Sequence, residues 1–343
     1  MLEIHEKETW EGFPFMQDKG LFLQSFHQKE LYESLGQRTW LFEVTGIRSL
    51  VTKIEAKRGT FLFLPYGPMP SDADSEAFTA FFTELRTLAQ EEGASFIRVS
   101  PYWEETDEKK ALLVGHGFRP APIHMLAETL WVLDLEGKTD EQLLEGMEKK
   151  HRNLVRRAIK DGVEISRTTT PEAVDRFVEL HWETRERHQF TPYPKDFFRN
   201  QVRLFAEDDQ VLVIEATHGG ELLASAIIMT YGKVGAYHHG ASSSNPEHRK
   251  IPASYLIQWE AIQEARRRGC SRYNFWGVAP YRLDAEGKRV YENLKHPFCG
   301  ITHFKTGFGG HRVDLLPCHD LVVNARYYLN WSIEKVRKWK RGF

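Results

Sequence analysis

One order of structural signals occurs twice along the chain, and it limits the folds that the chain can adopt. In each copy a helix ends at a glycine, a strand follows almost at once, and a proline closes the strand: residues 75–92, Gly93, residues 96–99 and Pro101, then residues 254–268, Gly269, residues 273–276 and Pro280. Glycine tolerates the left-handed conformation that ends many helices. The repetition predicts two α/β units related by internal duplication.

Further strand patterns accompany each copy. They cover residues 40–45 and 60–64 in the first half, and residues 212–215, 224–231 and 235–240 in the second. Strands that alternate with helices favour a mixed sheet in each unit. A chain of 343 residues also exceeds what one hydrophobic core usually organises, so two domains are expected, with one long single domain as the alternative.

Composition excludes several classes of protein. Hydrophobic residues make up 41% and charged residues 27%, as in globular proteins, and no apolar run approaches the roughly 18 residues of a membrane span. The charged start of the sequence lacks the apolar core of a signal peptide. Only Cys270, Cys299 and Cys318 occur, in no CxxC spacing, which predicts reduced thiols in a cytoplasm.

The net charge of −2 means that binding to a polyanion must depend on local basic patches. A predicted central helix carries the first. Its apolar side contains Leu143, Leu144, Met147, Leu154, Val155 and Ala158, and its opposite side carries Lys149, Arg152, Arg156 and Lys160, bordered by Lys150 and Arg157. Such a stripe could bind phosphates or be an ordinary solvated face.

Residues 324–341 form the second patch. They interleave Tyr327, Tyr328, Trp331, Val336 and Trp339 with Lys335, Arg337, Lys338, Lys340 and Arg341. Aromatic residues among cations suit a membrane interface or RNA. The alternative is a packed C-terminal helix with a basic end.

A long composite motif lies in the second half. It consists of Asn274-Phe275-Trp276-Gly277-Val278-Ala279, His296-Pro297, Gly300-Ile301 and His303-Phe304-Lys305-Thr306-Gly307-Phe308-Gly309-Gly310. The motif resembles the Fem (FemABX) family of peptidoglycan-bridge, tRNA-dependent aminoacyltransferases. Supporting stretches are Leu64-Pro65-Tyr66-Gly67-Pro68, Lys149-Lys150-His151-Arg152 and Gly240-Ala241-Ser242.

The resemblance implies two tandem acetyltransferase-like (GNAT) domains with mixed central sheets. We expect the first at residues 1–145, the second, with a basic entry helix, at 146–323, and a C-terminal basic helix at 324–343. Some members carry a long helical arm in the second unit, and the stretch between Phe197 and Val211 is too short for it. An armless member is therefore expected.

The resemblance also implies site residues. Lys305 is the expected catalytic residue, and the expected substrate-binding residues are Phe304, Trp276, Tyr66, Tyr102, Tyr237 and Arg185. The residues expected to bind tRNA are Lys149, Lys150, Arg152 and Arg156. Because Phe304 and Lys305 would alternate along a strand, we expect Phe304 by itself to face the core.

Other chemistry is less well supported. An acetyl-coenzyme A enzyme of this fold usually has a glycine-rich loop that presents backbone N–H groups to the pyrophosphate, whereas the stretch here is Arg249-Lys250-Ile251-Pro252-Ala253-Ser254. Adjacent strand histidines such as His238 and His239 should point to opposite faces, so we expect no metal site. No motif marks a serine or cysteine nucleophile.

Three further residues, His181, Arg185 and His188, should share one side of a helix, where they could hold a substrate phosphate or be a solvated face.

The sequence thus predicts an enzyme that transfers an amino acid from aminoacyl-tRNA to the stem-peptide amine of a peptidoglycan precursor, without a cofactor. The precursor would be lipid-linked or nucleotide-linked. The enzyme would be cytoplasmic, with a peripheral contact to the inner face of the membrane through its C-terminal helix. The alternatives are an N-acyltransferase acting on another amine or polysaccharide, and a non-catalytic RNA- or membrane-binding protein on the same scaffold.

Overall fold

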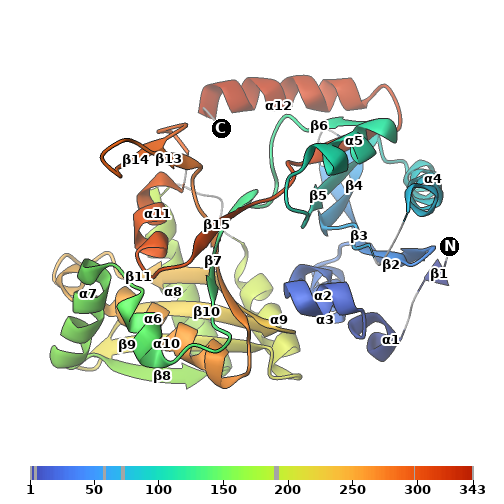
Figure 1. The fold of residues 1–343 in the computed structure, drawn as a ribbon. Coiled ribbons are helices and arrows are strands. Elements are labelled where there is room, and N and C mark those ends of the chain that lie inside the picture. Colours follow the sequence, from blue (N-terminus) through green and yellow to red (C-terminus); the bar gives the residue numbers. More distant parts are fainter. Residues whose placement is uncertain are drawn as a thin grey trace.

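The computed structural model describes residues 2–3, 6–56, 59–70, 74–188, 193–296 and 298–341. It contains two α/β units, each built around a seven-stranded mixed sheet. Figure 1 shows the first unit on the right and the second at the lower left, with the C-terminal helix along the top. The fold class predicted from the sequence is confirmed.

The first sheet has the order β1-β2-β3-β4-β5-β16-β6. Its strands are β1 (Leu2–Glu3), β2 (Thr39–Val44), β3 (Ile47–Ala56), β4 (Gly59–Tyr66), β5 (Phe96–Pro101), β16 (His319–Val322) and β6 (Phe118–Pro120). Only β4 and β5 pair in parallel, because the helix between them carries the chain back to the same end of the sheet.

The second sheet has the order β15-β7-β12-β11-β10-β9-β8. Its strands are β15 (His311–Asp314), β7 (Thr129–Asp134), β12 (Arg272–Gly277), β11 (Val234–Ser242), β10 (Glu221–Tyr231), β9 (Val211–His218) and β8 (Glu164–Thr168). Here β11 and β12 form the parallel pair. A separate hairpin joins β13 (Tyr281–Leu283) and β14 (Arg289–Tyr291).

The predicted duplication is present, with an exchange of strands between the units. The series β2-β3-β4-helix-β5 has the same order as β9-β10-β11-helix-β12. The strand beside β5 is β16, from the end of the chain, and the equivalent strand beside β12 is β7, from the first half. Each sheet therefore includes a strand that lies outside the sequence range predicted for its domain.

Twelve α-helices and two short 3-10 helices lie in the described part of the chain. They are α1 (Lys7–Glu11), α2 (Pro14–Lys19), η1 (Phe22–Gln24), α3 (Phe26–Ser34), α4 (Ser75–Glu91), α5 (Asp107–Gly115), α6 (Asp140–Glu145), α7 (Lys149–Lys160), α8 (Pro171–His188), α9 (Lys195–Ala206), η2 (His248–Lys250), α10 (Ala253–Arg267), α11 (Cys299–Thr306) and α12 (Tyr327–Arg341).

Separate cores bury the two faces of the second sheet. Apolar residues of α6, α7 and α10 pack on one face, and those of α8, α9 and the N-terminal helices pack on the other. The second core is therefore continuous between the two units. Because only four residues separate the end of α9 from the start of β9, no long helical arm is inserted there, as expected.

Two local predictions were wrong. The central helix is broken into α6 and α7, because the chain turns at Gly146 and the Glu148 amide donates a hydrogen bond to the Gly307 carbonyl. Phe304 and Lys305 lie on α11 and not on a strand. The buried residues of α11 are Thr302, Lys305 and Thr306, which is the i, i+3, i+4 spacing of a helix face.

Candidate functional site

A notch opens between the two parallel strands of the second unit. β11 and β12 pair from Val234 to Ala236 and then diverge, whereas β4 and β5 stay paired from Leu62 to Tyr66. The duplicated units therefore differ at this point. An opening between central strands at their carboxyl ends is a common place for a ligand in α/β folds.

Lys305 reaches the edge of this notch from α11. Its side chain is 5% exposed, and Nζ donates a hydrogen bond of 2.7 Å to the carbonyl of Gly277, the last residue of β12. The same nitrogen lies 5.7 Å from the centre of the Phe298 ring. Burial lowers the pKa of Lys305 to about 7. A lysine of this kind exchanges a proton readily near neutral pH.

Trp276 belongs to the same composite sequence motif as Lys305 and adopts a strained backbone conformation. Its φ angle is +68°, in the left-handed region, and its amide donates to the Asn274 side chain at 2.8 Å. The indole contacts the rings of Tyr66 and His238, with centroids 5.8 and 5.3 Å away. Such strain often occurs at functional sites.

Tyr66 brings the first unit to the same place. It also has a positive φ, its hydroxyl donates to the Ala127 carbonyl at 3.0 Å, and its ring lies 5.1 Å from that of Tyr102. Tyr66, Tyr102 and Trp276 were all predicted as substrate-binding residues. The structure brings these three together at the junction of the two units.

The other predicted substrate-binding residues lie elsewhere. Phe304 packs against Tyr255 and Phe308 in the core formed by α7 and α10, and Tyr237 also packs against that core. Arg185 is half-buried, with its guanidinium 5.8 Å from the centre of the Trp182 ring. Among the described residues, the ring contacts of Trp276 are instead with Phe22, Tyr66 and His238.

A bulge in β11 overturns the expectation that His238 and His239 face opposite sides. His239 pairs with Ile227 and Tyr237 with Ile228, so His238 is the extra residue, and the two imidazole centroids lie 3.8 Å apart. Burial lowers the pKa of His238 to about 3, so its imidazole is neutral.

His181 lies near these histidines and is itself buried, not on a solvated face. The side chain of His188 lies outside the described residues.

The helix α7 presents only part of the predicted basic stripe to solvent. Lys149, Lys150 and Arg156 are exposed. Arg152 is half-buried, and its guanidinium donates to the carbonyls of Leu144 and Glu145 at 3.2 Å. Arg152 therefore caps the end of α6, a structural role that sequence reasoning missed.

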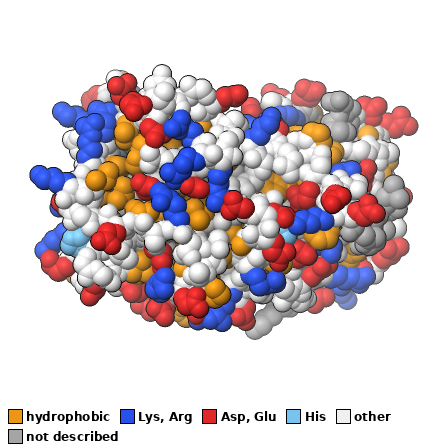
Figure 2. All heavy atoms as spheres, turned by 90° about the horizontal axis from the view of Figure 1, so that it is seen from below, with side chains coloured by type: hydrophobic (Ala, Val, Ile, Leu, Met, Phe, Trp, Pro, Cys, Tyr) orange, Lys and Arg blue, Asp and Glu red, His pale blue; other side chains and the backbone are white. Residues whose placement is uncertain are grey.

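The helix α7 that carries the stripe contains no acidic residue. On the face shown in Figure 2, Lys and Arg side chains lie among Asp and Glu. Beside the stripe is a shallow depression lined by Lys149, Lys150, Asn153, Leu154 and Arg157.

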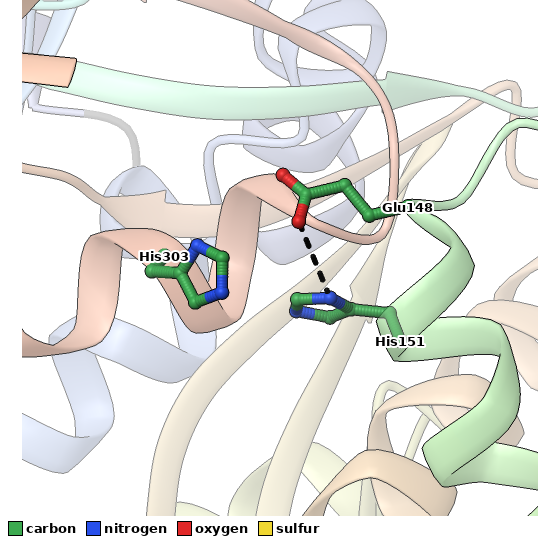
Figure 3. Close-up of side chains that lie close together, drawn as sticks. All are labelled: Glu148, His151 and His303. Carbon is green, nitrogen blue, oxygen red and sulfur yellow. Dashed lines mark ion pairs between the residues drawn. The ribbon is translucent and has the colours of Figure 1, made fainter. Parts of the chain in front are cut away.

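Glu148, His151 and His303 form a cluster whose potential ligand atoms lie within 4.8 Å of one another (Figure 3). An arginine already occupies the position of a cation there. Arg289 donates to Glu148 Oε1 at 3.0 Å and to His303 Nδ1 at 3.1 Å. We therefore interpret the cluster as a hydrogen-bonded contact between α7 and α11 and assign no metal to it.

A large cleft of about 510 Å³ lies between the two units. Aromatic and aliphatic side chains form its walls, including Phe15, Phe78, Trp103, Val132 and Leu315, and charged groups lie among them, namely Lys19, Lys109, Arg272, Glu104 and Asp134. Tyr102 and Asn274 line both this cleft and a small adjoining space at Trp276. The residues that line the cleft come from many separate elements, so no local sequence signal could have indicated it.

The pKa of Lys305 predicts a pH-dependent effect on stability. Because burial lowers this pKa from near 10.5 to about 7, the unfolded chain binds more protons than the folded chain between these values, and stability rises with pH across this window. We expect Lys305→Met to raise the free energy of unfolding at pH 6 by about 2–4 kcal/mol, and hardly at pH 10. Chemical denaturation at both pH values tests this, and an equal effect at both would contradict it.

Comparison with known proteins identifies relatives across most of the chain. A family model for the acetyltransferase (GNAT) domain matches residues 147–286. The UDP-N-acetylmuramoylpentapeptide-lysine N(6)-alanyltransferase of Weissella viridescens is 25% identical over 235 residues, covering 65% of this chain and 68% of that protein. The aminoacyltransferase FemB of Staphylococcus epidermidis is 21% identical over 370 residues, covering 84% and 85%.

A crystal structure of FemX superposes with a TM-score of 0.79 at 18% identity, over 97% of this chain and all of the other. This likeness supports the fold, and the two relatives are named for alanyl and aminoacyl transfer. Over most of its length the chain is therefore similar to the Fem aminoacyltransferases, and its fold consists of two tandem GNAT units.

Proposed function

We propose that this enzyme transfers an amino acid from aminoacyl-tRNA to the stem-peptide amine of a peptidoglycan precursor, as a step in forming interpeptide bridges. The observation that carries the proposal is the position of Lys305, which is buried at the notch between β11 and β12 with Nζ on the Gly277 carbonyl. Relatives named for alanyl and aminoacyl transfer support the same reaction class.

The start of α10 supports tRNA over coenzyme A as the donor. Proline at position 252 lacks an amide hydrogen, and the Ala253 amide already donates to the Ile251 carbonyl at 2.9 Å. A pyrophosphate would therefore find fewer free donors than a helix start usually offers. The exposed cations Lys149, Lys150 and Arg156 on α7 are suited to tRNA phosphates.

In the proposed reaction, Lys305 donates one proton and later accepts one. The acceptor amine attacks the ester carbonyl of the aminoacyl-tRNA, and the Lys305 ammonium stabilises the resulting oxyanion. As the C–O bond to the ribose breaks, Lys305 donates a proton to the leaving oxygen, and its neutral amine then takes the proton released by the new amide nitrogen. A pKa near 7 suits both transfers.

We place the acceptor in the cleft of about 510 Å³ between the units. Its aromatic walls suit the apolar faces of a sugar or peptide, and Lys19, Lys109 and Arg272 offer cations for phosphates or carboxylates. Tyr102 and Asn274 connect this cleft with the space at Trp276.

A transfer assay tests the proposed function. The purified protein is incubated with a mixture of charged tRNAs and either the nucleotide-linked or the lipid-linked precursor, and the product mass is measured. We expect the precursor to gain the mass of an amino-acid residue, with no product from uncharged tRNA. Transfer from acetyl-coenzyme A in place of charged tRNA would contradict the proposal.

The C-terminal helix supports a peripheral location of the protein at the inner face of the membrane. α12 packs on the first unit through Tyr327 and through Glu334, which accepts hydrogen bonds from buried Arg98. Its opposite side exposes Leu329, Val336 and Trp339, by 60%, 52% and 82%. Lys335, Arg337 and Lys338 lie beside this apolar side, as in helices that bind anionic lipid.

No helix in the described part of the chain is long and apolar enough to span a bilayer. A surface contact of this kind would favour the lipid-linked precursor.

Membrane binding can be tested with two substitutions on α12. We expect Leu329→Ser with Trp339→Ser to lower the partition constant for anionic phosphatidylglycerol vesicles, measured by co-sedimentation, by about 30-fold or more, because each side chain contributes about 1–2 kcal/mol of burial. A matched control is Val114→Ser, which removes a side chain 53% exposed on α5. Equal binding by the double variant and the control would contradict a lipid contact at α12.

A further inference from the structure

His151 joins the helix that carries the exposed cations to the helix that carries Lys305. It lies in the first turn of α7, is 0% exposed, and its Nε2 donates to the Phe304 carbonyl at 3.1 Å. Phe304 immediately precedes Lys305 on α11. A second bond runs in parallel, from the Glu148 amide to the Gly307 carbonyl at 2.8 Å.

The absence of a side chain at Gly307 makes room for the His151 imidazole. A Cβ atom on Gly307 would lie 1.9 Å from the imidazole, so only glycine allows the ring to approach. The imidazole packs against Tyr255 and Phe308, each with centroids 5.1 Å away. The motif Lys149-Lys150-His151-Arg152 and the motif at Phe304 to Gly307 therefore meet in space.

The state of the imidazole follows from its surroundings. Because Nε2 carries the hydrogen bonded to Phe304, Nδ1 carries a lone pair. Nδ1 has no hydrogen-bond partner within the described chain and lies 3.8 Å from Glu148 Oε2 (Figure 3). Burial lowers the pKa of His151, which keeps the ring neutral. The other titratable groups near it are His303, Tyr255 and Lys150, and Arg289 is hydrogen-bonded to both Glu148 and His303.

We propose that His151 is a positioning residue for Lys305: by holding the Phe304 carbonyl, it fixes the turn of α11 that aims Lys305 Nζ at Gly277. The inference rests on the proposed function of Lys305. It adds that the surface on α7 and the reacting lysine form one rigid unit, so that a donor held on α7 is presented at a fixed distance from Lys305.

Two amide substitutions separate positioning from mere packing. The nitrogen of glutamine in His151→Gln can reach the place of Nε2 and keep the bond to Phe304, whereas the shorter side chain in His151→Asn cannot. We expect His151→Asn to lower kcat by about tenfold with both KM values changed less than about twofold, and His151→Gln to recover most of kcat. His218→Ala, a histidine on β9 away from α11, serves as the control.

A second readout needs no substrate. Competitive labelling with trace acetic anhydride, read by peptide mass across pH, gives the pKa of each lysine. We expect the Lys305 pKa to rise by about one unit in His151→Asn, because a loosened α11 admits water, and to stay unchanged in His151→Gln. If Asn and Gln give the same Lys305 titration as the parent, the positioning role is overturned. If labelling behaves as expected but no charged tRNA supports transfer, the proposed function fails and the positioning of Lys305 stands.

Discussion

Replacing Lys305 with alanine is expected to lower kcat by about 10²–10³-fold, the loss that follows removal of one group that stabilises an oxyanion. KM for either substrate should change by less than about threefold, because the charge acts mainly on the transition state. The side chain is buried, so its loss leaves a cavity near the Gly277 carbonyl. Circular dichroism and thermal unfolding verify that the variant is folded, and unchanged turnover would exclude Lys305 from the reaction.

The pH dependence of kcat tests whether the positive charge of Lys305 acts in the reaction. With a pKa of about 7, the Lys305 ammonium is present below pH 7 and is lost as pH rises, so kcat should fall on the alkaline side. Lys305→Arg keeps its charge throughout this range. We expect the arginine variant to be slower than the parent and to lack the alkaline decrease. A decrease that persists in Lys305→Arg would assign this pKa to another group.

The fold could be predicted from the sequence where the signals are local. The helix ending before Gly93 and the strand that follows depend on apolar spacing and a glycine, and both appear in the structure. The exchange of β7 and β16 could not be predicted in this way. The pairing of strands more than two hundred residues apart depends on which edge of the sheet is free when the chain returns, and no local pattern records this.

The candidate site was predicted by motif more than by geometry. The motif singled out Lys305, but Phe304 and Lys305 were predicted to alternate along a strand, whereas Thr302, Lys305 and Thr306 have the spacing of one helix face. The bulge at His238 was missed because one extra residue reverses the side of every neighbour that follows it. Arg152 appeared to belong to the basic stripe because helical geometry places it there, whereas the break before α7 turns it toward free carbonyls.

These corrections change which cations should be tested for donor binding. Reversing Arg152 would uncap α6 and confuse binding with stability, whereas Lys150 and Arg156 are exposed. We expect Lys150→Glu with Arg156→Glu to raise KM for aminoacyl-tRNA by about tenfold or more at low salt, because each lost phosphate contact removes counterion release. The free energy of unfolding should change by less than about 1 kcal/mol.

Salt and a matched control decide whether this effect is specific. The difference between the parent and the double variant should shrink as salt rises, because added ions compete for the same phosphates. Reversing two exposed cations elsewhere, Lys110→Glu with Arg203→Glu, changes the net charge equally and should leave KM nearly unchanged. If both pairs raise KM alike, only the overall field of the protein matters. If neither does, tRNA must contact another surface, and the cations beside Trp339 on α12 would be the next to reverse.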